Sequence, residues 1–385
     1  MRKILFIFFC FLLVGCGKKD NKKVFDEIKK KNEKLDSYNI KGELSMYNGD
    51  NKYTYDVDVK YKKDSLYRVS LVNKVNNHEQ IILRNEDSVY VLTPSLNKSF
   101  KFQSDWPYNN SQVYILDRII KDIDNDEEKK YEYKDNMHIF TTKVEYSTNN
   151  ELVSQKVYFD DNKEIKKVEV YNTKEELVMN FKINSYDENC NIDNKIFDLN
   201  NNIDTSIKDE KETDNSDLNS NTNKNSNTSS SNSTIDSNNN SNSNENSNSN
   251  SNNTSNKMMP STNKKETKNV SKEVEDIIYP MYLPENTYLT SQNKLDKDDG
   301  QRVILTFGGD KSFTLIEETI TVSKELDVDL TFGEPDIIID TIGSIDDSSI
   351  NWVSNNIEYS LVSNDLSKDE LVSVAKSISS SSITK

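Results

Sequence analysis

The residues with the clearest chemical role in this sequence lie near its N-terminus, in the segment LVGC that ends at Cys16. Arg2 and Lys3 precede an apolar run over residues 4–14. That run is about half of the roughly twenty residues that a helix needs to cross a bilayer, so it is typical of a cleaved export signal. The Cys16 thiol is the nucleophile that can carry a diacylglyceryl thioether. We therefore predict a lipoprotein signal peptide over residues 1–15, lipidation of Cys16 and a tether over residues 16–23. The alternative is an ordinary secretory signal with a chance cysteine.

A lipidated Cys16 would hold the protein on the outer face of the cytoplasmic membrane. Two or three acyl chains give a stable anchor, because each buried methylene contributes about 0.8 kcal/mol. Residues 18–34 contain eight lysines against four acidic residues, an excess of four positive charges beside an anionic leaflet. A solvated helix face explains the same lysines and stays open as an alternative. The frequent Asn, Lys, Ile and Asp are typical of an AT-rich Gram-positive genome.

Charge limits the kinds of partner that this protein can have. The net charge is −16, and residues 271–385 hold nine Lys or Arg against twenty-two Asp or Glu, a net of −13. Such a field repels phosphate backbones, so we expect no nucleic-acid partner. A basic protein partner is permitted.

The side chains that usually carry catalysis or bind metals are sparse. The two histidines, His78 and His138, fall on separate expected strands, and no Cys-x-x-Cys or Gly-x-Ser-x-Gly motif occurs. Once Cys10 leaves with the signal peptide and Cys16 is acylated, Cys190 alone remains, which excludes an intrachain disulfide. We therefore expect no enzyme, no metal and no cofactor. A pair of carboxylates for glycoside hydrolysis stays open, because spacing in the sequence does not exclude it.

A tract of low complexity divides the chain. Residues 214–256 are mostly Asn and Ser, with Leu218 and Ile235 as the only aliphatic residues, so they offer no apolar surface to offset chain entropy. We predict a disordered linker over residues 206–270 between two separately folding domains, residues 24–205 and 271–385.

The first domain has the pattern of an antiparallel meander. Tyr53, Tyr55, Val57, Val59 and Tyr61 alternate with polar residues, after an amphipathic helix that contains Phe25 and Ile28. A second helix is indicated by Leu116, Ile119, Ile120 and Ile123, with Asn109, Asn110 and Ser111 as candidate caps. Further strands are expected at 66–72, 79–85, 88–93, 98–103, 137–146, 151–160, 164–171 and 175–184. The expected fold is α+β, a curved antiparallel half-barrel sheet whose concave face is covered by helices.

The second domain is expected to be a small α+β domain. Strands are predicted near 301–308, 312–320, 336–342 and 357–363. In the clearest helix of the chain, Ser367 and Glu370 form a capping box, and Leu371, Val374, Ala375 and Ile378 share one face. A sheet packed by this C-terminal helix satisfies the pattern.

One group of aromatic and aliphatic residues in the first domain could line a cavity that binds a ligand. Core packing is the better explanation of these residues, since aromatic strand residues mostly fill cores, and the near absence of glycine from the strands favours a filled interior. The candidates for a cavity or partner surface are Tyr90, Leu92, Phe100, Phe102, Trp106 and Tyr114.

Two contiguous segments of the first domain carry a family resemblance. Residues 77–94, NHEQIILRNEDSVYVLTP, and residues 95–108, SLNKSFKFQSDWPY, lie within a helix-then-meander order that resembles the lipoprotein-carrier superfamily of LolA, LppX-type and RseB-like proteins. They are most similar to its clostridial GerS-like germination and sporulation branch. Ser88 departs from the glycine expected after the Asn85 turn.

The second domain resembles an uncharacterised domain that is often joined to anti-sigma or sporulation envelope proteins. The similarity rests on residues 279–284, YPMYLP, on GEP at 333–335, and on residues 352–371. The family pattern usually has glycine in the turn at Asn355 and Asn356, and Asn is the residue best able to replace it at positive φ.

These resemblances imply three functions. The first is a binding or scaffolding lipoprotein for an envelope protein such as a sporulation or germination cell-wall hydrolase. The second is a carrier of lipid or of lipoprotein acyl chains. The third is an RseB-like sensor that regulates an anti-sigma factor.

Overall fold

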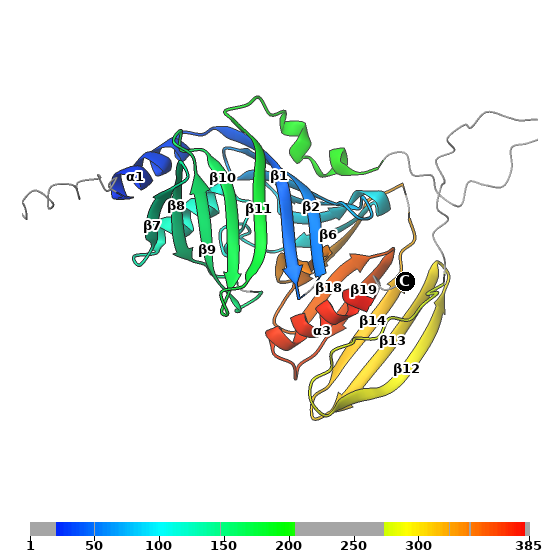
Figure 1. The fold of residues 1–385 in the computed structure, drawn as a ribbon. Coiled ribbons are helices and arrows are strands. Elements are labelled where there is room, and N and C mark those ends of the chain that lie inside the picture. The colour runs from blue at the N-terminus through cyan, green and yellow to red at the C-terminus, as the bar shows by residue number, and fades with distance from the viewer. Residues whose placement is uncertain are drawn as a thin grey trace, which may run out of the picture. The chain divides into compact units, whose positions relative to one another are not determined.

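Two β-sheets and three α-helices make up the part of the chain that the computed structural model describes, residues 21–49, 51–146, 148–204, 273–322, 324–338 and 340–381 (Figure 1). This agrees with the predicted α+β class. The helices are α1 (Asn21–Asn32), α2 (Leu116–Asn125) and α3 (Lys368–Ser381). The strands up to residue 204 are β1 (Ser37–Asn48), β2 (Asn51–Lys62), β3 (Leu66–Asn73), β4 (Glu79–Arg84), β5 (Val89–Thr93), β6 (Lys98–Phe102), β7 (Lys130–Lys134), β8 (Met137–Lys143), β9 (Leu152–Phe159), β10 (Ile165–Asn172) and β11 (Leu177–Glu188). The strands after residue 272 are β12 (Thr287–Lys297), β13 (Gly300–Gly309), β14 (Phe313–Thr319), β15 (Asp327–Thr331), β16 (Glu334–Ile338), β17 (Thr341–Ile345), β18 (Ser349–Ser354) and β19 (Ile357–Val362).

The first sheet contains two meanders that meet at β1. Its strand order is β15-β6-β5-β4-β3-β2-β1-β11-β10-β9-β8-β7, and every pair except β15–β6 is antiparallel. The predicted alternation on β2 is confirmed: Tyr53, Tyr55, Val57 and Val59 are buried. Because successive side chains of a strand point to opposite faces, this period of two buries one face of the sheet.

Helices α1 and α2 add their apolar faces to the core of the first sheet. Phe25 and Ile28 of α1 are buried, and so are Leu116, Ile119 and Ile123 of α2, as the helical spacing predicted. Burying one such side chain contributes about 1.5 to 3 kcal/mol relative to leaving it in water.

The predicted caps of α2 were wrong. The helix begins only after Ile115, which makes no side-chain cap hydrogen bond. Ser111 instead faces Glu145: its Oγ accepts a hydrogen bond from Glu145 N at 2.9 Å, and its own N–H donates to Glu145 O at 2.8 Å. The intervening Val113 and Tyr114 are buried, so this stretch stays extended to reach the core.

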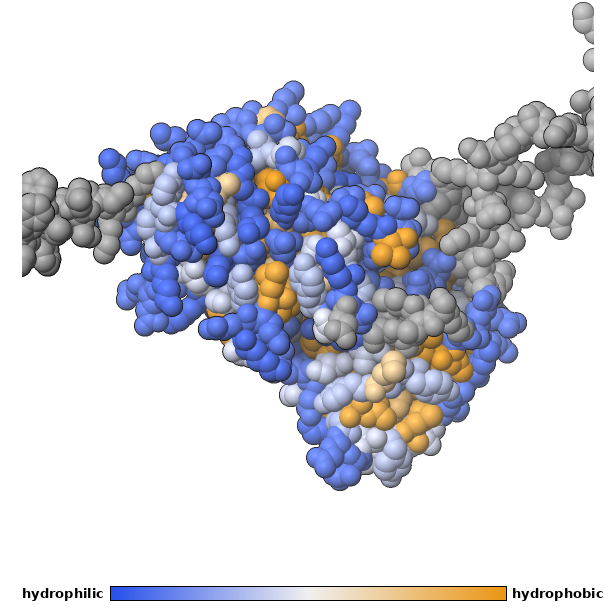
Figure 2. Space-filling view, viewed as in Figure 1, coloured by the Kyte–Doolittle hydropathy of each residue, from blue (hydrophilic) through white to orange (hydrophobic). Residues whose placement is uncertain are grey.

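The second sheet has the order β12-β13-β14-β19-β18-β17-β16. Helix α3 packs against this sheet, where it contacts β18 and β16 (Figure 1). The capping box is confirmed, since Ser367 N donates to Glu370 Oε2 at 2.9 Å and Glu370 N donates to Ser367 Oγ at 3.4 Å. The predicted helix face is confirmed by burial, which places Leu371, Val374, Ala375 and Ile378 in one cluster with Val303, Leu305 and Trp352. Figure 2 shows a mostly hydrophilic surface with apolar patches over β13 and β14.

Several strand predictions needed correction. The single strand expected at 336–342 is two strands, β16 and β17, which form an antiparallel pair from Glu334 opposite Ile345 to Ile338 opposite Thr341. Strands β7, β12, β15 and β18 were missed. On β12 every residue after Thr287 is exposed, so no buried face imposes a period on its sequence.

Strand β15 comes from the region after residue 272 but extends the first sheet. It pairs in parallel with β6, from Asp327 opposite Lys98 to Thr331 opposite Phe102. A second link joins Gln80 to β17, where Ile342 N donates to Gln80 Oε1 at 2.5 Å and Gln80 Nε2 donates to Ile342 O at 3.2 Å. The described residues on both sides of the 205–272 gap belong to one compact unit. That the two regions fold when separated stays a prediction.

Candidate functional site

Three sequence predictions fall on residues outside the described ranges: the signal peptide, the lipidation of Cys16 and the linker over residues 206–270. Only residues 21–23 of the predicted tether are described, and they belong to α1. Among the described residues, no helix is both long and apolar enough to cross a membrane.

The six predicted cavity or surface residues are all buried, but they do not line one surface. Phe100, Phe102, Trp106 and Tyr114 lie in the main core of the first sheet. Tyr90 and Leu92 lie in a separate cluster with Ile192 and Phe197. The pleat explains the division, because Val89 and Val91, which alternate with Tyr90 and Leu92 on β5, belong to the main core.

Trp106 packs into a polar and aromatic network. Its ring lies edge-on to Tyr67, with ring centroids 6.0 Å apart. The Tyr67 hydroxyl donates to Asp117 Oδ2 at 3.0 Å, and the Arg84 guanidinium donates to the Trp106 carbonyl at 2.5 Å. Burial raises the pKa of Tyr67 far above its usual value. These contacts fix Trp106 as a structural residue between sheet and α2.

A cavity of about 670 Å³ lies elsewhere, and none of the six residues lines it. Its volume is in the range of small-molecule sites. Residues on β1, β9 and β11 face residues on β16, β17, β18 and α3 across this space. The apolar lining includes Met46, Leu152, Leu177, Val178, Met179, Ile337, Ile338, Ile345, Ile350 and Val372.

Polar groups in the lining surround Asp336. Thr148 Oγ1 donates a short hydrogen bond to Asp336 Oδ2, and Ile337 N donates to Asp336 Oδ1 at 2.7 Å. Burial raises the pKa of Asp336 to about 6, partly opposed by the bond from Ile337 and by the charge of Lys376. Burial also lowers the pKa of Lys376. The cavity can therefore take an apolar group, and its polar lining includes the carboxyl of Asp336 and the amine of Lys376.

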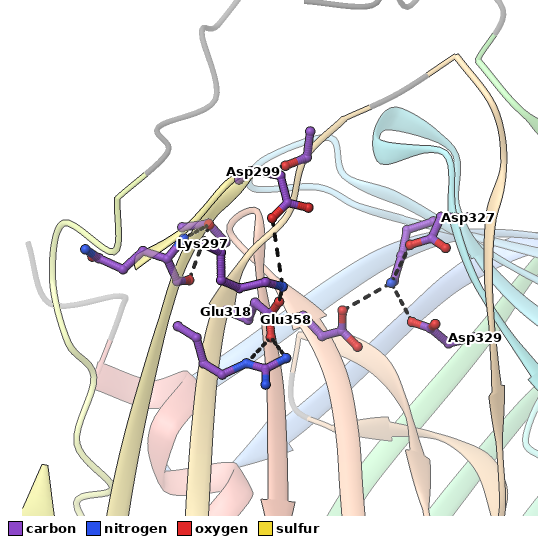
Figure 3. Close-up of polar contacts among 11 residues, drawn as sticks. Lys297, Asp299, Glu318, Asp327, Asp329 and Glu358 are labelled. Atoms are coloured by element: carbon purple, nitrogen blue, oxygen red, sulfur yellow. Dashed lines mark hydrogen bonds and ion pairs between the residues drawn. The ribbon is translucent and has the colours of Figure 1, made fainter. Parts of the chain in front are cut away.

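A charged site that was not predicted is centred on Lys98. Its carboxylate partners Asp327, Asp329 and Glu358 are labelled in Figure 3. The Lys98 ammonium lies 2.7 Å from Asp327 Oδ2, 2.5 Å from Asp329 Oδ2 and 3.2 Å from Glu358 Oε2. Burial works to lower the pKa of Lys98, but attraction to Glu358 and hydrogen bonds to Asp327 and Asp329 raise it above its usual value. Three carboxylates thus converge on one cation, and this holds β15 against β6. The only local signal in the sequence was the alternation of Asp with Val and Leu over residues 327–330.

Of the two histidines predicted on strands, only His138 lies on one, and His78 directly precedes β4. His138 is buried on β8, with Nδ1 2.9 Å from the Tyr131 hydroxyl. Within the described ranges, no three His, Cys, Asp or Glu side chains gather in a way that could hold a metal ion.

Comparison with known proteins identifies the family. The family described as sporulation protein YdcC-like matches residues 1–197. Sporulation protein YdcC of Bacillus subtilis (strain 168) is 31% identical over 368 residues, which cover 95% of this chain and 93% of that protein. The chain belongs to the YdcC-like family of sporulation proteins. Its membership confirms the sporulation part of the resemblance seen in the sequence.

The solved structures that are similar to this YdcC-like chain have low sequence identities and low TM-scores. The Pseudomonas aeruginosa MucA/MucB complex is 9% identical, covers 92% of this chain and 97% of that chain, and has a TM-score of 0.30. The structure of the CwlD amidase of Clostridioides difficile in complex with the GerS lipoprotein is 16% identical, covers 45% of this chain and 94% of that chain, and has a TM-score of 0.25. A lipoprotein-sorting protein domain from Vibrio parahaemolyticus is 12% identical, covers 46% of this chain and 96% of that chain, and has a TM-score of 0.30. TM-scores this low do not establish a common fold.

Proposed function

We propose that this YdcC-like chain is a lipid-anchored protein of the outer face of the cytoplasmic membrane that binds and holds another envelope protein during sporulation. The observation that carries the proposal is the filled interior of the first sheet. Phe100, Phe102, Trp106 and Tyr114 occupy the space where a carrier would keep a hollow. A sheet filled by its own side chains offers edges and outer faces, and proteins bind partners through such surfaces.

Membership of the YdcC-like family supports a role in sporulation, and the charge of the chain limits the class of protein that can be its partner. The acidic residues of the 271–385 region favour a partner with a basic surface, because complementary charge speeds encounter and excludes wrong partners. The partner classes implied by the sequence resemblance are a cell-wall hydrolase and an anti-sigma factor.

Crosslinking tests this proposal. Sporulating and vegetative cells would be treated with an amine-reactive crosslinker, and the tagged protein and its adducts would be identified by mass spectrometry. We expect a cell-wall hydrolase or another envelope enzyme, enriched in sporulating cells. Recovery of an anti-sigma factor would favour the sensor function. Lipid without any protein adduct would overturn the proposal.

The 670 Å³ cavity favours a second candidate function, the carriage of lipid. Native mass spectrometry of the delipidated chain, offered phospholipid or a diacyl lipopeptide, tests it. Val178→Arg places a charged side chain in the cavity lining, and Val153→Arg, at an exposed position of β9, is the matched control. Lipid that is retained by the control and lost from Val178→Arg would support a carrier. Leu92 and Phe102 are unsuitable positions, because each is 1% exposed and an arginine there would unfold the chain.

A further inference from the structure

Among the described residues, strand β15 pairs on one side only, because it is the terminal strand of the first sheet. Val328, Leu330 and Phe332 are 39%, 60% and 64% exposed, and they alternate along the chain. Residues two apart on a strand share one face, so Val328 and Leu330 lie side by side in an apolar row, and Phe332 follows directly after the strand. Exposed apolar rows on edge strands are uncommon, since an unpaired edge invites another strand.

The opposite face of β15 is acidic. Asp327 and Asp329 point to Lys98 together with Glu358, as the dashed lines in Figure 3 show. Three carboxylates face one ammonium, which leaves two negative charges in excess. The Asp327 side chain is 62% exposed, so part of this excess charge is open to solvent.

The other edge strands of the described residues lack this combination. On β7, Lys130, Glu132 and Lys134 place charges at alternate positions, a common protection of an edge. Strand β16 is largely buried. Strand β12 ends with Lys294 and Lys297.

The apolar residues of β12 also fail to form a row. Leu289 lies opposite Phe307, which belongs to the core, while the adjacent Tyr288 points to the other face. Strand β15 is therefore the edge that best suits a partner.

We propose that the outer edge of β15 pairs with an extended segment of the partner protein in which apolar residues alternate with Lys or Arg. The inference rests on the proposed function and names the surface that would carry it. Residues opposite each other in a sheet share a face, so apolar partner residues would cover Val328, Leu330 and Phe332. The basic residues would then face Asp327 and Asp329, while the backbone groups of the segment satisfy those of the edge.

Synthetic peptides test the chemistry of this site. A fluorescently labelled nine-residue peptide of alternating Val and Lys would be titrated into the full-length lipidated protein in detergent, with binding measured by anisotropy. We expect it to bind at least tenfold more tightly than a Val/Glu alternating peptide or a peptide of the same composition with Val and Lys in two blocks. We also expect its affinity to fall with added salt. Equal affinity for the alternating and block peptides would overturn the proposal.

Variants locate the binding site. Leu330→Lys adds a positive charge to the apolar row, and we expect it to weaken binding at least tenfold. Val362→Lys is the matched control, since Val362 is 42% exposed on β19, and its affinity should not change. Phe332→Lys provides a second variant if Leu330→Lys lowers the melting temperature. Unchanged binding by a folded row variant would overturn the proposal.

A photocrosslinking amino acid at position 330 or 362 separates this inference from the proposed function. In sporulating cells, a crosslink from position 330 to a basic, extended segment of the envelope protein recovered by whole-protein crosslinking would support the inference. If that protein is recovered but never through position 330, the inference is wrong and the proposed function stands. If no protein is recovered by either method, both are wrong.

Discussion

Lys98 Nζ donates a hydrogen bond to Asp327 Oδ2 at 2.7 Å across 229 positions of sequence. The bond joins the first residue of β6 to the first residue of β15. Because the Lys98 side chain is only 9% exposed, its charge depends on these partners. This contact therefore couples the regions on the two sides of the Asn/Ser-rich segment.

Replacing Lys98 with Met should destabilise the whole protein. The variant leaves Asp327, Asp329 and Glu358 facing one another without a cation, and we expect a loss of about 1 to 2 kcal/mol, since the two aspartates stay partly hydrated. Urea unfolding measures the effect. Lys101→Met is the control, because the Lys101 ammonium lies over the Tyr90 ring on the other face of β6. Equal losses in both variants would show that the ion cluster contributes nothing specific.

Residues 24–205 and 271–385, expressed separately, should each fold. The second region has an apolar cluster of its own. The cluster of the first region also includes Ile320, Ile337, Ile342 and Val353, which the first fragment loses together with β15. We expect the first fragment to melt at a lower temperature than the intact chain and to regain part of the difference when the second fragment is added. Calorimetry measures both effects. Limited proteolysis of the intact chain should cut first within residues 214–256. Two fragments without cooperative melting would contradict the domain prediction.

The burial of Glu317 should make the folded protein less stable as pH rises. Its carboxylate accepts the N–H of Ile278 at 3.0 and 3.2 Å, and burial raises its pKa from 4.5 to about 7. Between pH 4.5 and about 7, this carboxyl keeps its proton in the folded state but has lost it in the unfolded chain. Proton binding therefore favours the folded state. This contribution is therefore present at low pH and lost as pH rises from about 4.5 to about 7.

Glu317→Gln should remove that dependence and make the protein more stable by about 2 kcal/mol at pH 8. Urea unfolding at pH 5 and pH 8 measures it. Asp336 and Asp340, whose pKa values burial raises to about 6, act in the same direction, so a smaller slope remains. Glu318→Gln is the control, since Glu318 pairs with Arg302 and Lys297. A Glu317→Gln variant with the full wild-type slope would refute the assignment.

Cys16→Ala should release the protein from the membrane or leave an uncleaved precursor. The thiol is the predicted acylation site, and two acyl chains account for stable anchoring. Fractionation of cells expressing the variant, followed by mass spectrometry of its N-terminus, measures both outcomes. A processed variant that remains bound after high-salt washing would contradict the lipoprotein prediction.

Local patterns in the sequence predicted the local structure well. Asn355 and Asn356 adopt φ values of 51° and 63°, the left-handed conformation expected of the turn between β18 and β19 without glycine. The departure at Ser88 is explained by Asn85, whose Oδ1 accepts the N–H of Asp87 and of Ser88 and so holds the turn. Both results depend on interactions within a few residues.

Interactions between residues that are far apart in the sequence could not be predicted from it. The five residues of β15 alternate, but alternation does not specify which edge a strand joins, and β6 offers no complementary motif. The half-buried Asp336 could not be told from the many surface carboxylates, because its environment depends on α3 and on Thr148. Cavity and ion cluster both arise where segments from the two regions meet.

Strand β15 is synthesised long after β6, the strand with which it pairs. A chain made from its N-terminus presents β6 long before β15 exists, and such non-local pairing slows folding. A product that is truncated or cut within residues 205–272, and separated from its C-terminal region, would keep the N–H and C=O groups of the β6 edge unpaired. Unpaired strand edges recruit strands from other molecules, so we expect such a product to aggregate more readily than the intact chain.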